Sequence, residues 1–225
     1  MESQYSLTNE ETDDLVEIAS RKYRSPIDLN ILNQLLNMVY GALVQNNRIL
    51  GIRSDLRFAQ SHVLGEPDLP LCFQRDDTQA ITRFFESLKS QLRVDHNRSK
   101  RPGDPTFPSY GWCRERDTSE HPHYHLMLLF NADVYGYLGN YQELNAKNMA
   151  TRIQKAWCSA LGLAHEDYFT LAEFPPNAVY RFSRFDALDR NPVYWNFLVR
   201  LAYLAKTRTK DVHSGYRNFG TSQLM

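Results

Sequence analysis

The fold and the candidate site both depend on one stretch of the sequence, HPHYHLMLLFN, which runs from His121 to Asn131. Its alternation and its apolar second half predict a buried β-strand, in which side chains two positions apart lie on one face. His123 and His125 therefore share a face, about 7 Å apart along the strand. Because imidazole is the commonest protein ligand for metals, the pair can hold one metal ion. A hairpin with solvated histidines would show the same pattern, so the rest of the chain has to decide.

The composition predicts a globular, intracellular protein. The 225 residues are 42% hydrophobic and include 12 Phe and 13 Tyr, which is enough for a substantial core. The 3 cysteines form no CxxC pair, which favours a reducing cytoplasm. Residues 1–20 contain no Lys or Arg, which argues against a signal peptide. The longest apolar run, 126–130, is far too short for a membrane span, so no membrane partner is expected.

The net charge is zero, but the charges are unevenly distributed. Residues 1–20 carry six acidic side chains and no basic one, whereas residues 181–225 carry eight basic and three acidic ones. Such a basic end can contact phosphates even on a neutral protein, although solvated surface is the default explanation of any charged cluster. The candidate DNA contacts are Arg200, Arg208, Lys210 and Arg217.

Hydrophobic periodicity and end signals predict the order of the elements. Helices are expected over 9–23, 26–45, 76–93, 145–161 and 192–207. Ser25 with Pro26, and Asn191 with Pro192, form the cap and first position of two of these helices, and Gly162 ends another. Strands are expected over 49–58, 109–117, 121–131, 168–174 and 178–183, and the tail after Lys210 is expected to be irregular.

These elements predict an α+β fold. We expect a central antiparallel sheet of about five strands with helices packed on it. Residues 1–47 are expected to form an N-terminal helical extension, and residues 48–225 the main domain with its basic C-terminal tail.

A carboxylate joins the two histidines if the hairpin has the expected register. With a three-residue turn over 118–120, Glu115 faces His123 directly, whereas a four-residue turn without a bulge would put Glu115 on the opposite face. One carboxylate and two imidazoles leave coordination positions open, which suits Mg²⁺ or Mn²⁺ with a substrate oxygen. His121 has the same parity and is the alternative ligand, although it is expected in the turn. A salt link to a neighbouring arginine is the structural alternative for Glu115.

Tyr203 lies on the polar side of the last expected helix. At 100° per residue, the apolar side chains of this helix gather on the opposite side. Arg200 is near Tyr203 on the polar side, and Lys206 follows on the same face three residues later. Neighbouring cations favour the phenolate form of a tyrosine and also bind a phosphodiester. A surface tyrosine beside lysines is the structural alternative, so Tyr203 decides little by itself.

Three segments together resemble a known family. They are WCRERDTSEHPHYHLMLLFN (residues 112–131), residues 148–163, and YLAKTRTKDVHSGYRNFG (residues 203–220). The His-x-His strand, the upstream acid and the later Tyr-x-x-Lys resemble the HUH endonucleases that initiate rolling-circle replication. From about Ile49 to Ser222, the chain is more closely similar to the inovirus-type replication proteins and the YagK/YfjJ C-terminal domain family. The strand over 49–58 lacks the Thr-rich pattern of the family's first strand, so no site residue is assigned from it.

The resemblance implies a mechanism. A divalent cation, Mg²⁺ or Mn²⁺, held by His123, His125 and Glu115 would polarise a phosphate of single-stranded or extruded origin DNA. Tyr203 would attack it, leaving a 5′-phosphotyrosine and a free 3′-OH, while Lys206 orients the phosphate or neutralises charge. No GxxxxGK[ST] motif is present, so a separate helicase and polymerase are expected. The resemblance implies the cytoplasm of a bacterial host cell. The DNA target, the oligomeric state and a phage, satellite or prophage origin stay open.

Other functions fit parts of this pattern. A cupin-type metal enzyme also uses His-x-His, but it needs a Glu four or five residues after the second His, where this chain has Leu129 and Phe130. A DNA-binding replication or regulatory protein of the same fold would bind an origin without cutting it. A transposase or relaxase would use the same chemistry on a different substrate.

Overall fold

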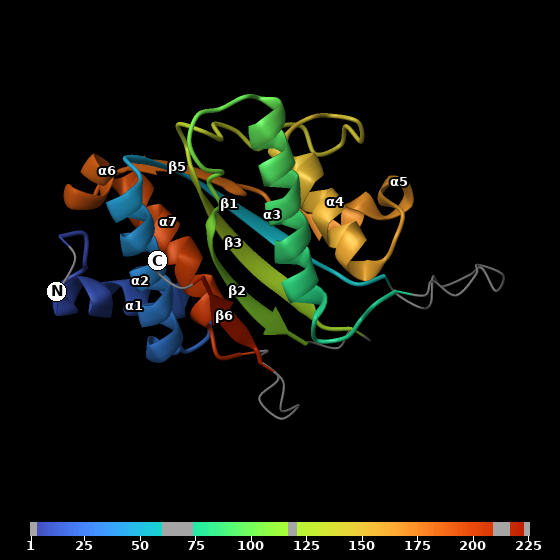
Figure 1. Cartoon of the computed structure of the whole chain (residues 1–225). Coiled ribbons are helices and arrows are strands. Elements are labelled where there is room, and N and C mark those ends of the chain that lie inside the picture. Colours follow the sequence, from blue (N-terminus) through green and yellow to red (C-terminus); the bar gives the residue numbers. More distant parts are fainter. Residues whose placement is uncertain (1–3, 60–73, 117–120, 209–216, 223–225) are drawn as a thin grey trace.

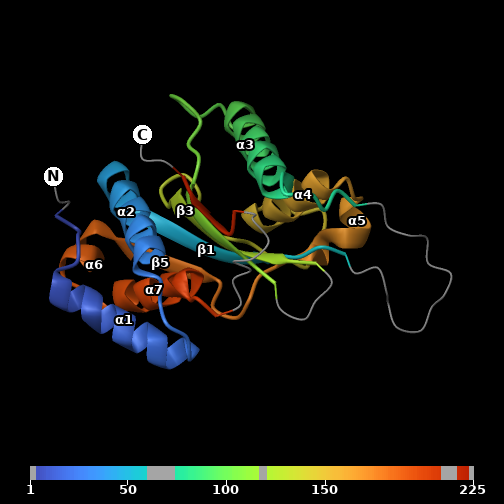
Figure 2. The same cartoon turned by 90° about the horizontal axis from the view of Figure 1, so that it is seen from below.

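The computed structural model describes residues 4–59, 74–116, 121–208 and 217–222. Within these ranges, helices pack on both faces of one antiparallel sheet (Figure 1, Figure 2). The expected α+β class is therefore confirmed. None of the helices in these ranges combines the length and the apolarity that a membrane-spanning segment needs.

The sheet has six strands in the described residues, one more than the expected number of about five. They are β1 (Arg48–Leu56), β2 (Ser109–Glu115), β3 (His123–Asn131), β4 (Ala172–Glu173), β5 (Val179–Ser183) and β6 (Phe219–Thr221). Their order is β4-β1-β3-β2-β6, and β5 pairs with the same edge of β1 as β4. The three long strands β1, β3 and β2 are therefore neighbours at the centre of the sheet.

One face of the sheet packs on α3 (Ala80–Arg98) and α4 (Met149–Leu161), which α5 (His165–Tyr168) follows. The strand residues that point to this face are almost all apolar, among them Leu50, Ile52, Leu126, Leu128 and Phe130. Trp157 of α4 lies in the middle of an aromatic cluster there, and its indole N–H donates to the Arg57 carbonyl at 2.6 Å. As expected, Gly162 ends α4, with a positive φ of 76°.

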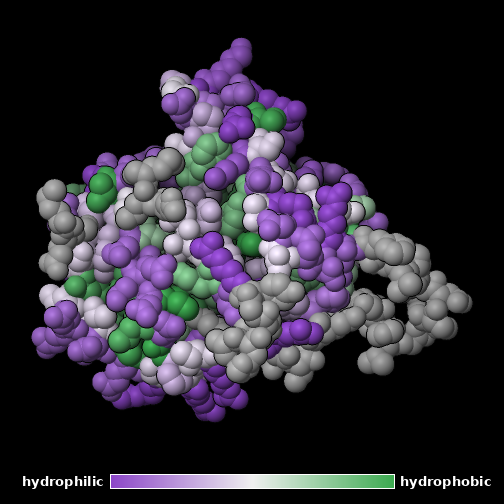
Figure 3. Space-filling view, turned by 60° about the horizontal axis from the view of Figure 1, so that its bottom comes forward, coloured by the Kyte–Doolittle hydropathy of each residue, from purple (hydrophilic) through white to green (hydrophobic). Residues whose placement is uncertain are grey.

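The opposite face packs on α2 (Leu29–Gln45) and α7 (Pro192–Ala202), while α1 (Asn9–Tyr23) lies against α7 and α6 (Arg184–Leu188) precedes it. Asn191 caps α7 and Pro192 is its first residue, as the sequence predicts. The helices of the expected N-terminal extension bury their apolar side chains in the same cluster as this face of the sheet. Hydrophilic residues predominate on the side of the molecule in Figure 3, with small hydrophobic patches between them.

The start of the second helix differs from the expectation. It begins at Leu29 with Asp28 as its cap, and not at Pro26. The reason is a long-range contact, because Ile27 forms an isolated β-bridge with Lys206. The Asp28 amide also donates to the Ala205 carbonyl at 2.8 Å. The chain before α2 is therefore extended rather than helical.

Three further expectations are wrong. The segment expected as a strand over 168–174 is mostly a 3₁₀ turn, η1 (Phe169–Leu171), followed by the two residues of β4. The last helix ends at Ala202, before the expected end at Thr207, and a 3₁₀ turn, η2 (Tyr203–Ala205), follows it. The tail expected to be irregular contains β6, which pairs with the otherwise open edge of β2.

Candidate active site

The candidate ligands meet where the three central strands run side by side. In the antiparallel register, Glu115 of β2 pairs with His123 of β3, as the expected hairpin register predicts. His125 of β3 pairs with Asp55 of β1 on its other side. Residues paired across neighbouring strands point to the same face of a sheet. These side chains therefore converge on the face that α2 and α7 cover.

Glu115, His123 and His125 form a compact group that fits a divalent cation. His123 Nε2 and His125 Nε2 are 3.1 Å apart, and Glu115 Oε2 is 3.3 Å from His125 Nε2. One ligand atom from each residue lies within 4.8 Å of the other two. Two ring nitrogens and a carboxylate oxygen that converge in this way match the donor set of a three-ligand site with open positions.

Strand β1 adds two charged residues to this group. Asp55 Oδ1 lies 2.7 Å from His125 Nδ1, and Arg53 Nη2 lies 3.4 Å from both Asp55 Oδ1 and His125 Nδ1. The ring nitrogen can make only one of these two hydrogen bonds, and the short one to the carboxylate identifies Nδ1–H as a donor to Asp55. All three residues are between 4% and 6% exposed. The site thus extends over three strands and is largely closed to water on the β1 side.

Tyr203 lies beside this group, at the start of η2. Its hydroxyl oxygen is 2.7 Å from Lys206 Nζ and 3.4 Å from His125 Nε2. Lys206 Nζ is also 2.9 Å from Glu115 Oε2, so the lysine links the tyrosine to the acid. The guanidinium of Arg53 lies 4.5 Å from the centre of the Tyr203 ring. The structure therefore brings the expected nucleophile and the expected ligands into one network.

The N-terminal part of the chain supports the position of Tyr203. Tyr23, the last residue of α1, packs edge-on against the Tyr203 ring, with the ring centres 5.0 Å apart. Its hydroxyl donates to the Val199 carbonyl of α7 at 2.9 Å. The bridge between Ile27 and Lys206 fixes the chain directly after η2.

The charges of the group shift the pKa values of its members. Burial alone would raise the pKa of Glu115, but the hydrogen bonds and charges of His125 and Lys206 outweigh it and hold that pKa at about 2. Burial and the neighbouring His125 lower the pKa of His123 to about 4. Burial would lower the pKa of His125 as well, but hydrogen bonds to Asp55 and Glu115 raise it. At pH 7, Glu115 is therefore an ionised carboxylate and His123 a neutral imidazole, the forms that bind a metal.

The expected DNA contacts are placed at different distances from this network. Arg200 of α7 lies 5.9 Å from the centre of the Tyr203 ring. Arg208 is exposed shortly after η2, and Arg217 is exposed just before β6. Lys210 lies outside the described residues. Of the three cations that the structure describes, Arg200 is the one with a recorded contact to the Tyr203 ring.

His121 is not part of the cluster, although it was the alternative ligand. Its ring packs against Phe58, with ring centres 5.7 Å apart, and its Nδ1 lies 3.7 Å from a carboxylate oxygen of Asp76. Residues 117–120, which include the expected turn, lie outside the described part of the chain. The geometry thus favours Glu115 over His121 as the third ligand.

Arg53 and Asp55 are the site residues that the sequence analysis missed. Asp55 and His125 are 70 positions apart, so no local pattern connects them. The sequence did contain one indication. Arg53 and Asp55 point to the same face of β1 as Ile49 and Gly51, and that face is buried. Charged side chains in the buried row of a central strand need partners, and such partners are often functional.

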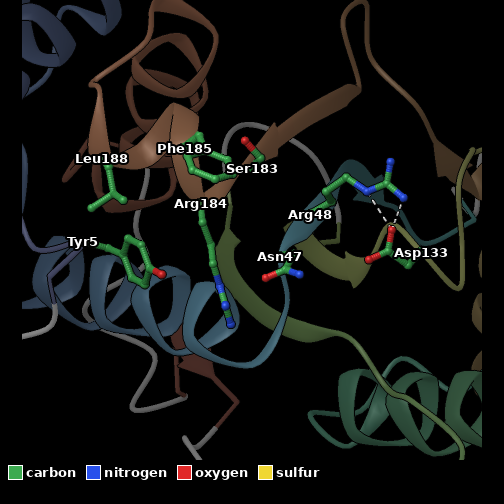
Figure 4. A pocket seen from close by; sticks show the side chains of 8 residues that line it. All are labelled: Tyr5, Asn47, Arg48, Asp133, Ser183, Arg184, Phe185 and Leu188. Atoms are coloured by element: carbon green, nitrogen blue, oxygen red, sulfur yellow. Dashed lines mark hydrogen bonds and ion pairs between the residues drawn. The ribbon is translucent and has the colours of Figure 1, made fainter.

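A cavity of about 770 Å³ lies at the other end of the sheet (Figure 4). Arg48, at the start of β1, and Asp133, after β3, form an ion pair in its wall. The side chains of Tyr5, Phe185 and Leu188 also line it, whereas none of the candidate site residues within the described ranges does. The cavity is therefore separate from the candidate site.

Comparisons with known proteins place the chain in a family. A family model described as YagK/YfjJ C-terminal domain matches residues 8–222. The chain is 38% identical to the uncharacterized protein YfjJ of Escherichia coli (strain K12) over 161 residues, which cover 69% of this chain and 76% of that protein. It is 35% identical to the uncharacterized protein YagK of the same strain over 181 residues, which cover 79% of this chain and 84% of that protein. No solved structure matches the chain significantly.

The family match begins at α1 and ends after β6. It therefore includes the N-terminal helices, which lie outside the resemblance noted from about Ile49 onward. The chain belongs to the YagK/YfjJ C-terminal domain family.

Proposed function

We propose that this protein is a metal-dependent DNA endonuclease and strand transferase of the HUH type. It nicks single-stranded or extruded origin DNA and thereby initiates rolling-circle replication. The observation that carries the proposal is the position of Tyr203, whose hydroxyl lies 3.4 Å from His125 Nε2 and 2.7 Å from Lys206 Nζ. A tyrosine, a cation, two imidazoles and a carboxylate in one network are the parts that tyrosine-mediated cleavage of a phosphodiester needs.

In the proposed reaction, the Tyr203 oxygen attacks a phosphorus atom of the DNA backbone. A bond from this oxygen to phosphorus forms, and the bond from phosphorus to the 3′ oxygen breaks. The phenol loses its proton to solvent and the leaving 3′ oxygen takes one up, so the products are a 5′-phosphotyrosine and a free 3′-OH. Because one phosphodiester replaces another, a later 3′-OH can reverse the step and rejoin a strand.

Lys206 acts as an electrostatic stabiliser in this proposal. Burial would lower the pKa of Lys206, but its hydrogen bonds to Tyr203 and Glu115 raise it, so the side chain is an ammonium ion at pH 7. An ammonium ion cannot accept the phenol proton, but it stabilises the phenolate and the charge on the phosphate. Its contact with Glu115 holds the amine in position for both.

His123, His125 and Glu115 would hold the divalent cation, Mg²⁺ or Mn²⁺. When bound, the cation supplies Lewis-acid activation of the scissile phosphate. The fit rests on the convergence of three donor atoms, all within 4.8 Å of one another, on strands whose pairing fixes their positions. Glu115 and His125 are buried and exclude water from their side of the group, whereas His123 is half-buried at its open side.

DNA would reach Tyr203 along the neighbouring cations. Arg200 lies beside the tyrosine ring, and the exposed Arg208 and Arg217 extend the basic surface of this part of the chain. Lys210 belongs to the same basic segment of the sequence. In this proposal the protein only nicks and rejoins DNA in the cytoplasm of a bacterial host, so a separate helicase and polymerase unwind and extend the strand.

The test is a nicking assay on single-stranded oligonucleotides that tile the DNA around the gene, with Mn²⁺ or with a chelator. We expect site-specific cleavage and a covalent protein–DNA adduct in the presence of Mn²⁺, and neither in the presence of the chelator. His123→Ala and His125→Ala should each abolish both, whereas the matched control His165→Ala, on α5, should keep them. Glu115→Ala should weaken Mn²⁺ binding more than DNA binding.

Two results would contradict the proposal. Cleavage by His123→Ala or His125→Ala at the parent rate would place the active site elsewhere. DNA binding by the parent without any adduct, across all the oligonucleotides, would favour the non-catalytic DNA-binding protein.

A further inference from the structure

The shortest side-chain contact around the candidate ligands comes from a residue outside the ligand set. Asp55 Oδ1 lies 2.7 Å from His125 Nδ1, while the other ring nitrogen, Nε2, faces His123 and Glu115. The two side chains come from paired positions of β1 and β3, so the sheet itself fixes the distance between them. Both residues are buried, at 6% and 4% exposure.

We propose that Asp55 is a positioning residue of the metal site. Its carboxylate orients the His125 ring so that Nε2 is the ligand atom. This inference rests on the proposed function, because it assumes that the cluster holds a divalent cation. An imidazole that donates Nδ1–H to a carboxylate must present Nε2 with a free lone pair when it is neutral. Asp55 thus selects both the tautomer and the angle of the ring.

Arg53 completes the arrangement on the same strand. Its Nη2 lies 3.4 Å from Asp55 Oδ1, and its guanidinium lies 4.5 Å from the centre of the Tyr203 ring. Asp55 is therefore held from one side by an arginine that also packs against the candidate nucleophile. The contacts from Arg53 to Asp55 and from Asp55 to His125, together with the contact of Arg53 with the Tyr203 ring, thus fix His125 and Tyr203 relative to each other.

Stability alone does not explain this chain of contacts. Three ionisable side chains between 4% and 6% exposed have lost most of their hydration, and apolar side chains of similar size at such positions are often neutral or stabilising. On the opposite face of the same strand, the apolar residues Ile52 and Leu56 flank these positions, with the uncharged Ser54 between them. A requirement for a fixed imidazole at His125 accounts for the charged row.

The experiment compares three variants of the full chain. Asp55→Ala removes the carboxylate, and Asp55→Asn keeps a neutral acceptor of the same size. Asp133→Ala is the matched control, because it removes another aspartate that pairs with an arginine of β1, at the opposite end of the strand. For each protein we would measure the affinity for Mn²⁺ and for Co²⁺, the visible spectrum of the Co²⁺ complex, and the melting temperature without metal.

We expect Asp55→Ala to weaken the affinity for both metals by about 10- to 100-fold and to change the Co²⁺ spectrum, because the ring is no longer oriented. Asp55→Asn should recover part of the affinity, and Asp133→Ala should leave affinity and spectrum unchanged. The spectrum and the partial rescue separate positioning from stability, since a merely structural role would lower the melting temperature without altering the metal complex of the folded fraction.

The outcomes separate this inference from the proposed function. Parent-like affinity and spectrum for folded Asp55→Ala would overturn the positioning role while leaving the metal site intact. Absence of Mn²⁺ and Co²⁺ binding by the parent would overturn both. Weakened binding by Asp55→Ala, together with a parent that never cleaves DNA, would support the positioning role and overturn the nuclease.

Discussion

One face of the sheet has two ends of opposite character, although the same strands build both. Where β1 begins and β3 ends, this face carries an apolar end, formed by Ile49, Gly51 and Leu129. Where β1 ends and β3 begins, the same rows of side chains continue as a charged end, formed by Arg53, Asp55, Glu115, His123 and His125. Both ends lie under α2, α7 and η2 and are largely buried.

The two ends contribute differently to the free energy of folding. The apolar end gains free energy from burial, at about 25 cal/mol for each Å² of apolar surface removed from water. At the charged end, burial of each ionised group costs desolvation free energy. The attraction within its ion pairs balances that cost only when their geometry is good. A sheet that needed stability alone would extend the apolar row to both ends. Under the proposed function, the metal site accounts for the charges at this end.

Tyr203→Phe would give the largest effect that separates the two ends. The change removes the attacking oxygen, so DNA cleavage and the covalent adduct should fall below detection. The free energy of unfolding should change by about 1 kcal/mol, because the hydroxyl loses its contacts with Lys206 and His125 while Lys206 keeps its contact with Glu115. A nicking assay, a denaturing gel and chemical denaturation measure the three quantities.

Other tyrosines provide the controls for this assignment. Tyr194 is fully buried on the far side of α7, and Tyr216 lies outside the described residues. Tyr216→Phe should keep the adduct, and mass spectrometry of the parent adduct should find the nucleotide on Tyr203. A nucleotide on Tyr216, or an adduct formed by Tyr203→Phe, would refute the assignment.

Leu129→Ala tests the apolar end in the opposite sense. Leu129 is 2% exposed, so truncation should lower the free energy of unfolding by about 2 to 5 kcal/mol. The Mn²⁺ affinity of the folded protein should stay at the parent value, because the ligands are untouched. Denaturant unfolding and a Mn²⁺ titration below the unfolding midpoint check both.

Leu188→Ala is the matched control, since Leu188 is 44% exposed and its loss should cost no more than about 0.5 kcal/mol. A loss of Mn²⁺ affinity in folded Leu129→Ala would mean that the two ends are coupled and that the division between them is too simple.

The basic residues of the C-terminal segment sharpen the comparison through the salt dependence of DNA binding. Replacing Arg208, Lys210 and Arg217 together with alanine should weaken DNA binding without regard to sequence. It should also reduce the slope of log affinity against log salt by about one unit for each lost phosphate contact. Arg48→Ala, at the opposite end of β1, is the control and should leave the slope unchanged. An equal slope for the triple variant and the parent would exclude these residues from the DNA contact.

Removing the ion pair between Glu11 and Arg190 should have the smallest effect on the free energy of unfolding. It shows what an ion pair away from the candidate site contributes to stability. Arg190 Nε lies 2.7 Å from Glu11 Oε1, and this hydrogen bond is the main reason why the pKa of Glu11 is below its ordinary value of 4.5. Because the folded-state pKa is lowered, the stabilisation is present above pH 4.5 and is lost as the pH falls through the folded-state pKa. Glu11→Gln should therefore lower the free energy of unfolding by about 0.5 to 1 kcal/mol at pH 7.

The same variant should match the parent once the pH is low enough to protonate Glu11. Denaturant unfolding of both proteins between pH 7 and pH 3 measures the difference. Glutamine keeps one oxygen that can accept from the Thr8 backbone N–H, so the comparison isolates the charged hydrogen-bonded pair with Arg190. A difference that does not shrink towards low pH would mean that the charge of Glu11 contributes nothing.

Features with a local cause could be predicted from the sequence. The cap at Asn191, the Gly162 terminus and the hairpin register that opposes Glu115 to His123 depend on residues close together in the chain. The parity of a strand also fixed which histidines share a face, because successive side chains alternate.

Features with a distant cause could not be predicted. Pro26 has the signature of a helix start, yet the neighbouring Ile27 pairs with Lys206, and that pairing keeps the segment extended. β6 is only three residues long, and its partner strand β2 lies about a hundred residues earlier in the chain, a separation typical of sheet pairing that sequence patterns do not report. The role of Asp55 could not be predicted for the same reason, because only the pairing of β1 with β3 brings it next to His125.

The bridge between Ile27 and Lys206 has a consequence for any attempt to trim the chain to the residues that the proposed reaction uses. A version that starts at residue 48 would retain the three candidate metal ligands, Asp55 and Tyr203 itself. It would lose Tyr23, which packs on the Tyr203 ring, and the segment that fixes Lys206. Such a fragment would keep the candidate ligands and Tyr203. It would lack the contacts of Tyr23 and Ile27 that hold Tyr203 and Lys206 in position beside those ligands.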